Sequence, residues 1–142
     1  MTRLAKFALA AAIPAAVFIS PAMAEMMSSM TTLSAAEEVP PAKSTGSGTL
    51  DVTYDGASKK LSWKGAFKGL TGAPTAAHFH GPAAAGMKAG VEFPATVTAS
   101  PFEGTATLTD AQAADLAAGK LYFNIHTAAN PDGEIRGQVM MK

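Results

Sequence analysis

The sequence predicts an all-β protein. The expected fold is a Greek-key β-sandwich or barrel-like domain of about seven to eight short antiparallel strands, with one short helix near residues 109–118. Short runs of alternating apolar and polar residues recur along the chain, as they do in half-buried strands. Turn signals rich in glycine, proline and aspartate separate these runs. Only one segment has the capping residues and the length of a helix.

Residues 1–24 have the features of a cleaved signal peptide. Arg3 and Lys6 form a charged start, residues 7–19 are largely apolar, and Ala22-Met23-Ala24 provides the small residues that signal peptidase requires. The apolar run is shorter than the roughly 20 residues of a spanning helix, so we expect no membrane span in the mature chain. Cleavage after Ala24 would place the protein in the periplasm or outside the cell.

The segment at residues 25–32 has neither helical nor strand periodicity, and we interpret it as a flexible leader. An alternative is that Met26, Met27 and Met30 offer thioether ligands to copper(I). The folded domain is expected to cover residues 33–142.

The first clear strands form a predicted hairpin. Polar and apolar residues alternate over residues 50–55, Asp55-Gly56 is a turn signal, and a second alternating run follows over residues 60–64. Trp63 lies on the apolar face of the second run, so we expect it in the core.

The middle of the chain alternates between strands and loops. We expect a strand over residues 75–80, a loop over 83–90, an edge or irregular strand over 91–99 and a strand over 102–108. Pro94 has no N–H to donate, which confines its strand to a sheet edge. Thr109 and Gln112 form a predicted capping box at the start of the helix, and Gly119 ends it.

Two strands close the domain, over residues 120–127 and 134–141. The short turn at residues 129–133 predicts that they pair antiparallel. Each strand separates an apolar face from a polar face, and the polar set is Tyr122, Asn124, His126, Glu134, Arg136 and Gln138. Apart from the histidine, we interpret this set as a supporting structural network, in which a buried glutamate–arginine pair offsets two charges.

The chain has only three histidines. His78 and His80 alternate on one predicted strand and therefore point to the same face, and His126 lies on the polar face of another. If these strands are neighbours, the imidazoles converge as a candidate site for copper or zinc, with ring nitrogens within about 5 Å of one another. In the alternative interpretation the rings only make hydrogen bonds, and His78 or His126 holds the turn at residues 130–134.

Several separated motifs agree in order and spacing with a known family. They are residues 33–41 (LSAAEEVPP), 69–72 (GLTG), 76–82 (AAHFHGP), 118–119 (AG), 124–127 (NIHT) and 130–138 (NPDGEIRGQ). Together they resemble the CHRD domain, the repeat named after chordin, over roughly residues 33–141. The resemblance implies an extracytoplasmic β-rich domain that occurs singly in bacterial exported proteins, with no general catalytic activity attached to it.

Composition excludes several function classes. The lysines are scattered and the chain has 11 basic and 11 acidic residues, which argues against a nucleic-acid partner. The absence of cysteine excludes a disulfide, a thiolate nucleophile and a cysteine-ligated metal. The sequence has no G-x-S-x-G motif, which argues against a serine hydrolase, and no recognisable pair of catalytic carboxylates, which argues against a glycosidase.

Three functions therefore remain. The first is a non-catalytic binding or structural module of the bacterial envelope, whose partner is an unknown protein or envelope component. The second is a periplasmic copper- or zinc-binding protein with a three-histidine site. The third is a small metalloenzyme.

Overall fold

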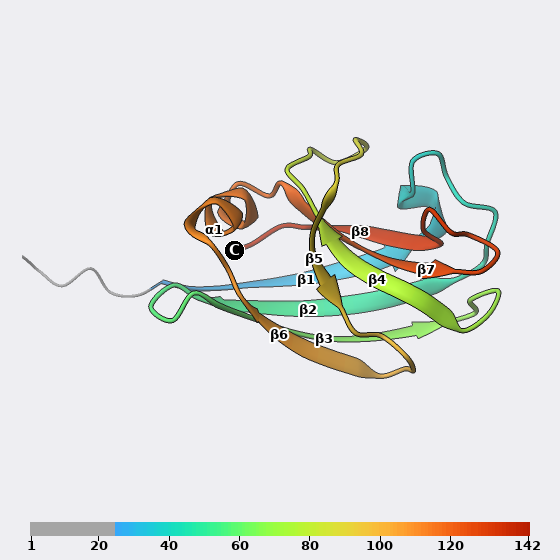
Figure 1. The fold of residues 1–142 in the computed structure, drawn as a ribbon, viewed down its shortest axis with the longest axis horizontal. Coiled ribbons are helices and arrows are strands. Elements are labelled where there is room, and N and C mark those ends of the chain that lie inside the picture. The colour runs from blue at the N-terminus through green and yellow to red at the C-terminus, as the bar shows by residue number, and fades with distance from the viewer. Residues whose placement is uncertain (1–24) are drawn as a thin grey trace, which may run out of the picture.

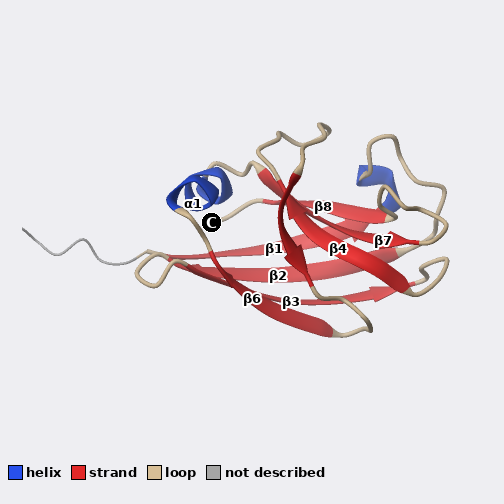
Figure 2. Ribbon diagram, in the orientation of Figure 1, coloured by secondary structure: helices blue, strands red, loops and turns tan. Residues whose placement is uncertain are grey.

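The computed structural model describes residues 25–142, so the predicted signal peptide lies outside the described residues. The elements in chain order are β1 (Met26–Ser34), a 3-10 turn (Ala35–Glu37), β2 (Ser47–Asp55), β3 (Lys60–Lys68), β4 (Pro74–His80), β5 (Val91–Ala95), β6 (Phe102–Thr107), α1 (Asp110–Ala117), β7 (Leu121–Thr127) and β8 (Ile135–Val139). The strands form one antiparallel sheet of eight (Figure 2). The predicted all-β class with one short helix is confirmed.

The sheet curls so that its two halves face each other as a nearly closed barrel (Figure 1). Its strand order is β5-β4-β7-β8-β1-β2-β3-β6, which leaves β5 and β6 at the edges. Aromatic rings join the halves across the interior. The ring centroids of Trp63 on β3 and Phe79 on β4 lie 5.0 Å apart, and those of Phe102 on β6 and Phe123 on β7 lie 5.8 Å apart.

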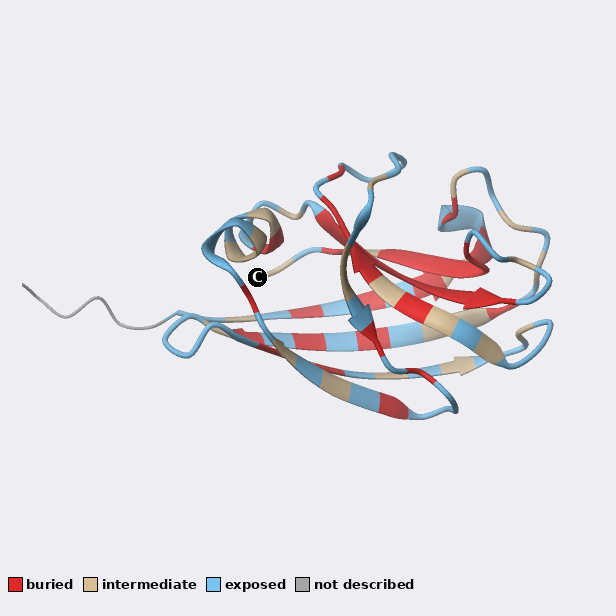
Figure 3. Ribbon diagram, viewed as in Figure 1, coloured by how far each residue is buried: buried red, intermediate tan, exposed pale blue. Residues whose placement is uncertain are grey.

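The core fills the inside of this curled sheet. Stripes of buried and exposed residues along β1 and β2 mark the alternation of inner and outer faces (Figure 3). Trp63 is buried as predicted, and α1 contributes the fully buried Leu116. The largest fully buried apolar side chains are Phe79, Phe123, Leu33, Leu50, Leu61, Leu116, Leu121, Ile125, Ile135, Val52 and Val139.

The prediction of a flexible leader over residues 25–32 was wrong, because Met26–Ser34 form β1. This strand pairs with β2 along its whole length and with β8 on its other side. The inner face of β1 carries Ser29 and Thr31, which are 8% and 7% exposed and whose hydroxyls lie 3.2 Å apart. Because these inward positions carry hydroxyl groups instead of apolar side chains, the alternation of apolar and polar residues does not predict the strand.

The outer face of β1 carries the methionines considered as copper(I) ligands. Met26 and Met30 are both strongly exposed. They are four residues apart on one strand, so their Cα atoms are about 13 Å apart, too far to share an ion. Met27 points to the other face and packs against the core.

The two ends of the described chain lie side by side. Lys142, the last residue, pairs with Ser28 through two backbone hydrogen bonds of 2.9 and 3.2 Å. The pairing of β1 and β8 therefore continues past the end of β8 to the end of the chain.

Local signals produced the expected structures elsewhere. Thr109 and Gln112 form the predicted capping box at the start of α1, and Gly119 ends the helix with a φ of 69°. Pro94 lies in the edge strand β5, as its missing N–H requires. Within residues 25–142, no helix has the length and apolar character needed to cross a bilayer.

Candidate metal centre

Two neighbouring strands place the three histidines on one face of the sheet. His78 and His80 alternate on β4, and His126 lies on β7, which pairs with β4. Ala77 and Ile125 point from the same strands into the core and are at most 2% exposed. The alternation predicted from sequence therefore holds on both strands, and all three imidazoles lie on the outer face.

The structure brings the three rings together. One nitrogen from each histidine lies within 4.8 Å of the others. Nδ1 of His78 is 3.0 Å from Nε2 of His126. Two ligands of a tetrahedral zinc ion are about 3.3 Å apart when each bond is 2.0–2.1 Å long. The His78–His126 pair is close to that separation, and the cluster as a whole has the size of a metal site.

Two of the rings use one nitrogen to bind the backbone. Nδ1 of His80 lies 3.1 Å from the carbonyl oxygen of Ala89, and Nδ1 of His126 lies 2.8 Å from that of Pro131. A carbonyl oxygen only accepts hydrogen bonds, so both Nδ1 atoms carry a proton, and in the neutral rings Nε2 carries a lone pair. Such carbonyl contacts fix the tautomer and orientation of metal-ligating histidines. The Pro131 contact also makes His126 hold the turn at residues 129–133.

Asn124 lies between the two Nε2 atoms. Its Oδ1 is 3.0 Å from Nε2 of His80 and 3.0 Å from Nε2 of His126. The side chain is only 2% exposed, on the outer face of β7 and directly opposite His78 on β4. Asn124, predicted as a supporting residue, therefore belongs to the cluster itself.

Burial keeps two of the imidazoles in their neutral, metal-binding form. It lowers the pKa of His78, and the nearby rings of His126 and His80 lower it further. Burial also lowers the pKa of His80, although hydrogen bonds to Ala89 and Asn124 oppose the change. Both rings are therefore mostly neutral at pH 7, with one ring nitrogen free to bind a metal.

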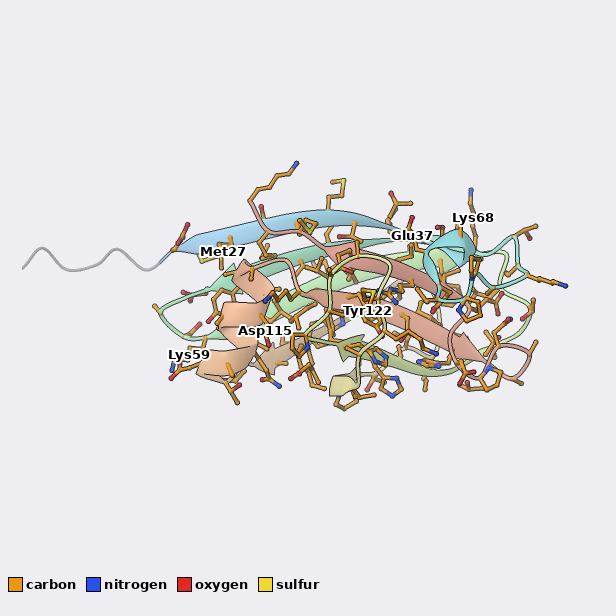
Figure 4. All side chains as sticks on the ribbon, turned by 90° about the horizontal axis from the view of Figure 1, so that it is seen from above. Met27, Glu37, Lys59, Lys68, Asp115 and Tyr122 are labelled. Atoms are coloured by element: carbon orange, nitrogen blue, oxygen red, sulfur yellow. The ribbon has the colours of Figure 1, made fainter. Side chains whose placement is uncertain are left out.

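A stack of planar groups supports His80. Its ring lies parallel to that of Tyr122, with an interplanar angle of 1° and centroids 4.8 Å apart. The guanidinium carbon of Arg136 lies 3.5 Å from the centroid of the Tyr122 ring. Tyr122 sits beneath the loop at residues 81–90, which joins β4 to β5 (Figure 4). Its hydroxyl donates to the carbonyl oxygen of Ala89, the same oxygen that His80 binds.

Two other predicted supporting residues pin this loop to the sheet. Arg136 donates to the carbonyl oxygen of Met87 at 2.6 Å. Gln138 donates through Nε2 to the carbonyl oxygens of Ala83 and Gly119, at 2.9 and 2.8 Å. The polar face of β7 and β8 is thus covered by a loop whose backbone it binds, which explains why β7 is buried on both sides.

Glu134 does not join the histidine cluster, and the expected glutamate–arginine pair was wrong. The Glu134 carboxylate is fully buried and accepts hydrogen bonds from Ser44, Thr71, Thr127 and Asn130. Burial raises its pKa, but the hydrogen bonds from Ser44, Thr127 and Thr71 outweigh this and lower it to about 2. Hydroxyl and amide donors satisfy the carboxylate, so it does not need Arg136. Within residues 25–142 the one ion pair joins Lys59 and Asp110.

Glu38 is the residue that sequence reasoning missed. It is 7% exposed, and its Oε1 is buried with no hydrogen-bond partner in the described chain. Burial raises the pKa of Glu38 to about 7, although the Arg136 charge and a hydrogen bond from Asn124 act to lower it. Gly133 lies against the side chains of both Glu38 and Asn124. A Cβ at residue 133 would clash with Oε1 of Glu38 and lie 2.7 Å from Nδ2 of Asn124. The sequence did offer a signal for Glu38, because the residue lies in the first of the motifs that resemble the CHRD domain, residues 33–41.

A surface groove lies elsewhere on the molecule. It has a volume of about 720 Å³ and lies along β2, β3 and β6, with Asp51, Lys64 and Glu103 among its lining residues. It contains none of the histidines. The histidine cluster is therefore a compact group of buried and half-buried side chains outside this groove.

Comparison with known proteins gives one match. The family model of the CHRD domain matches residues 30–139. No curated protein and no solved structure matches the chain. The matched range starts within β1 and ends at the last residue of β8, so it contains every residue of the histidine cluster.

Proposed function

The chain belongs to the CHRD-domain family, and from that premise we propose that it is a non-catalytic module that binds a zinc or copper ion through His78, His80 and His126. The ion would fix the outer face of β4 and β7 together with the loops above them. The module would then present a rigid surface to a partner, which we propose is a protein or another component of the cell envelope.

One observation carries the metal proposal. His80 and His126 each commit Nδ1 to a backbone carbonyl and direct Nε2 toward the other cluster members. Rings that served only to hold the turn and the loop would need no acceptor atoms facing one another. Orientation of the outer nitrogen by a backbone carbonyl is the usual support for a metal-bound imidazole.

The compartment is part of the proposal. Residues 1–24 have the pattern of a signal peptide, and the described fold begins with β1 at Met26, just after the proposed cleavage site. Cleavage after Ala24 would therefore leave the domain intact. Sequencing the N-terminus of protein from the periplasmic or culture fraction tests this, and an isolated protein that retains residues 1–24 would contradict it.

The metal proposal is tested by measuring bound metal in the exported protein. The wild type should carry zinc or copper near one ion per chain, and the triple variant His78→Ala, His80→Ala, His126→Ala should carry none. Thr75→Ala, an exposed substitution on the same strand β4, is the control and should retain the ion. A wild type that takes up neither metal, even after incubation with each, would sink the proposal and leave a CHRD module whose histidines serve only the fold.

A further inference from the structure

We propose that Asn124 is the fourth ligand of the metal ion, bound through Oδ1, and that Glu38 holds the amide in that orientation. The inference rests on the proposed metal function and goes beyond it, because it makes the site four-coordinate and closed. Structural zinc sites are closed in this way, whereas catalytic sites keep a position open for water or substrate. The inference therefore favours zinc, and a structural role for it.

The first argument is a count of lone pairs and protons. Nε2 of His80 and Nε2 of His126 carry lone pairs, because their Nδ1 protons face Ala89 and Pro131. Oδ1 of Asn124, 3.0 Å from each of these nitrogens, has no proton either.

Only the ring of His78 can supply a proton to this group. Nδ1 of His78 is 3.0 Å from Nε2 of His126, so a proton there satisfies that single contact. Nε2 of His80 would still face Oδ1 of Asn124, lone pair to lone pair. A cation at the centre satisfies all four atoms at once, because each of them then donates its lone pair to the ion.

The second argument is geometric. The two contacts of Asn124 Oδ1 and the contact between His78 and His126 are each 3.0 Å, against about 3.3 Å between ligands of a tetrahedral ion with bonds of 2.0–2.1 Å. The separation between Oδ1 and the Nε2 atoms of His80 and His126 is thus close to that between two ligands of the same ion. The three histidine nitrogens lie within 4.8 Å of one another, so the widest separation among them must close by small side-chain rotations when the ion binds.

Glu38 gives the amide its direction. Its Oε1 and the Nδ2 of Asn124 both lie against Gly133, where the missing side chain leaves room for them. With its –NH₂ group on the side of this carboxylate, Asn124 turns its oxygen toward the histidines.

The competing arrangement has the amide turned over. Nδ2 would then donate to the two Nε2 atoms and satisfy them without a metal, but Oδ1 would face the Glu38 carboxylate, which is a second acceptor. The two arrangements predict opposite effects of Asn124→Asp. An aspartate keeps an oxygen ligand and adds a negative charge, but it removes both donor protons.

Cobalt(II) is the probe for the test, because its visible absorption reports the number and geometry of its ligands, and azide is the probe for an open position. At about pH 8 the wild-type protein should give a tetrahedral cobalt spectrum that azide leaves unchanged. Asn124→Leu, which keeps the number and branching of the side-chain heavy atoms, should bind cobalt at least about tenfold more weakly and respond to azide. Asn124→Asp should still give a tetrahedral cobalt spectrum that azide leaves unchanged, because it keeps an oxygen ligand.

Glu38→Gln tests the orienting role. It should weaken cobalt binding by about tenfold while the spectrum stays tetrahedral, because the ligands remain and only their support is lost. Glu103→Gln on the edge strand β6 is the control for a carboxylate-to-amide change, because Glu103 is exposed and lies outside the cluster. It should bind cobalt as the wild type does.

The outcomes separate this inference from the proposed function. A wild-type protein that binds cobalt but changes its spectrum with azide has an open position, and the fourth-ligand assignment is then wrong while metal binding stands. An Asn124→Asp protein that binds cobalt but changes its spectrum with azide, with circular dichroism showing a folded protein, would identify the turned-over amide and have the same consequence. A wild-type protein that binds no cobalt, zinc or copper removes the proposed function and the inference together.

Discussion

Two of the three histidine rings use their two nitrogens for different contacts. In His80 and His126 the outer nitrogen holds a loop or a turn, and the inner one faces the other cluster members. The outer contacts go to main-chain oxygens of Ala89 and Pro131, so the side chains at those positions do not enter the interaction. The structural and metal-binding interpretations of the histidines are thus compatible, because they use different atoms of the same ring.

Glu134 gives a prediction about acid stability. Its pKa is lowered from 4.5 to about 2 in the folded protein, so the folded state binds the proton less tightly than the unfolded state does. The stabilisation is complete above about pH 4.5 and is lost as the pH falls toward 2. Its size is about 3 kcal/mol, from 1.36 kcal/mol per unit of pKa. Glu134→Gln should lower the free energy of unfolding at pH 7 by about this amount and flatten its decline below pH 4.5.

Urea unfolding at a series of pH values measures both effects. Glu103→Gln is the matched control, because Glu103 is an exposed carboxylate on the edge strand β6. It should leave the acid limb of the curve unchanged. An acid limb in Glu134→Gln as steep as that of the wild type would assign the acid sensitivity to other carboxylates.

At the scale of elements, β7 is the strand on which the cluster depends. Its inner residues Leu121, Phe123 and Ile125 fill the core, and its outer residues are covered by loops. A strand buried on both sides has little freedom to shift its register, because a shift by one residue would move every side chain to the wrong face. This rigidity keeps Asn124 and His126 fixed relative to β4.

Alternation along strands is also what made most of the site predictable. The period of two residues placed His78, His80 and His126 on polar faces, and the short turn at residues 129–133 predicted that β7 and β8 pair. The same period does not predict a strand whose inner face carries hydroxyl groups, as at Ser29 on β1. It also cannot predict the backbone partners of the rings, which lie in irregular loops, or the approach of Glu38, which is far from the histidines in sequence.

Removal of residues 25–32 tests the place of β1 in the fold. Their loss would expose the backbone hydrogen-bonding groups of β2, remove the pairing of Ser28 with Lys142 and uncover the core beneath Thr31. The shortened chain should therefore lose its cooperative thermal unfolding, followed by circular dichroism. A chain that starts at Glu25 is the control and should unfold cooperatively. If the shorter chain unfolded at the same temperature as this control, β1 would be dispensable and the leader interpretation would be restored.

At the scale of the molecule, the proposed ion would join parts of the fold that the core leaves separate. The cluster residues lie on β4 and β7, and their supports come from the 81–90 loop, the 129–133 turn and Glu38. These segments cover the outside of the sheet, away from the apolar interior. A metal bound there stabilises the folded state relative to the unfolded state, because the unfolded chain does not assemble the four ligands.

Zinc should therefore raise the melting temperature. At a free zinc concentration one hundred times the dissociation constant, the expected gain is about 2.7 kcal/mol, or roughly 10 °C for a domain of this size. Differential scanning calorimetry with and without zinc measures the shift. Thr75→Ala should show the same rise as the wild type, and the triple histidine variant should show none. An equal rise in the triple variant would place the stabilising ion at a different site.

The pairing of Ser28 with Lys142 has a consequence for how the domain can be used. Because the first and last strands run side by side, the chain enters and leaves the fold at the same place. Such a unit can be inserted into a surface loop of a host protein, or permuted by joining its ends and opening it at another loop, without separating any pair of strands. A longer polypeptide can therefore carry this domain at either end or in its middle.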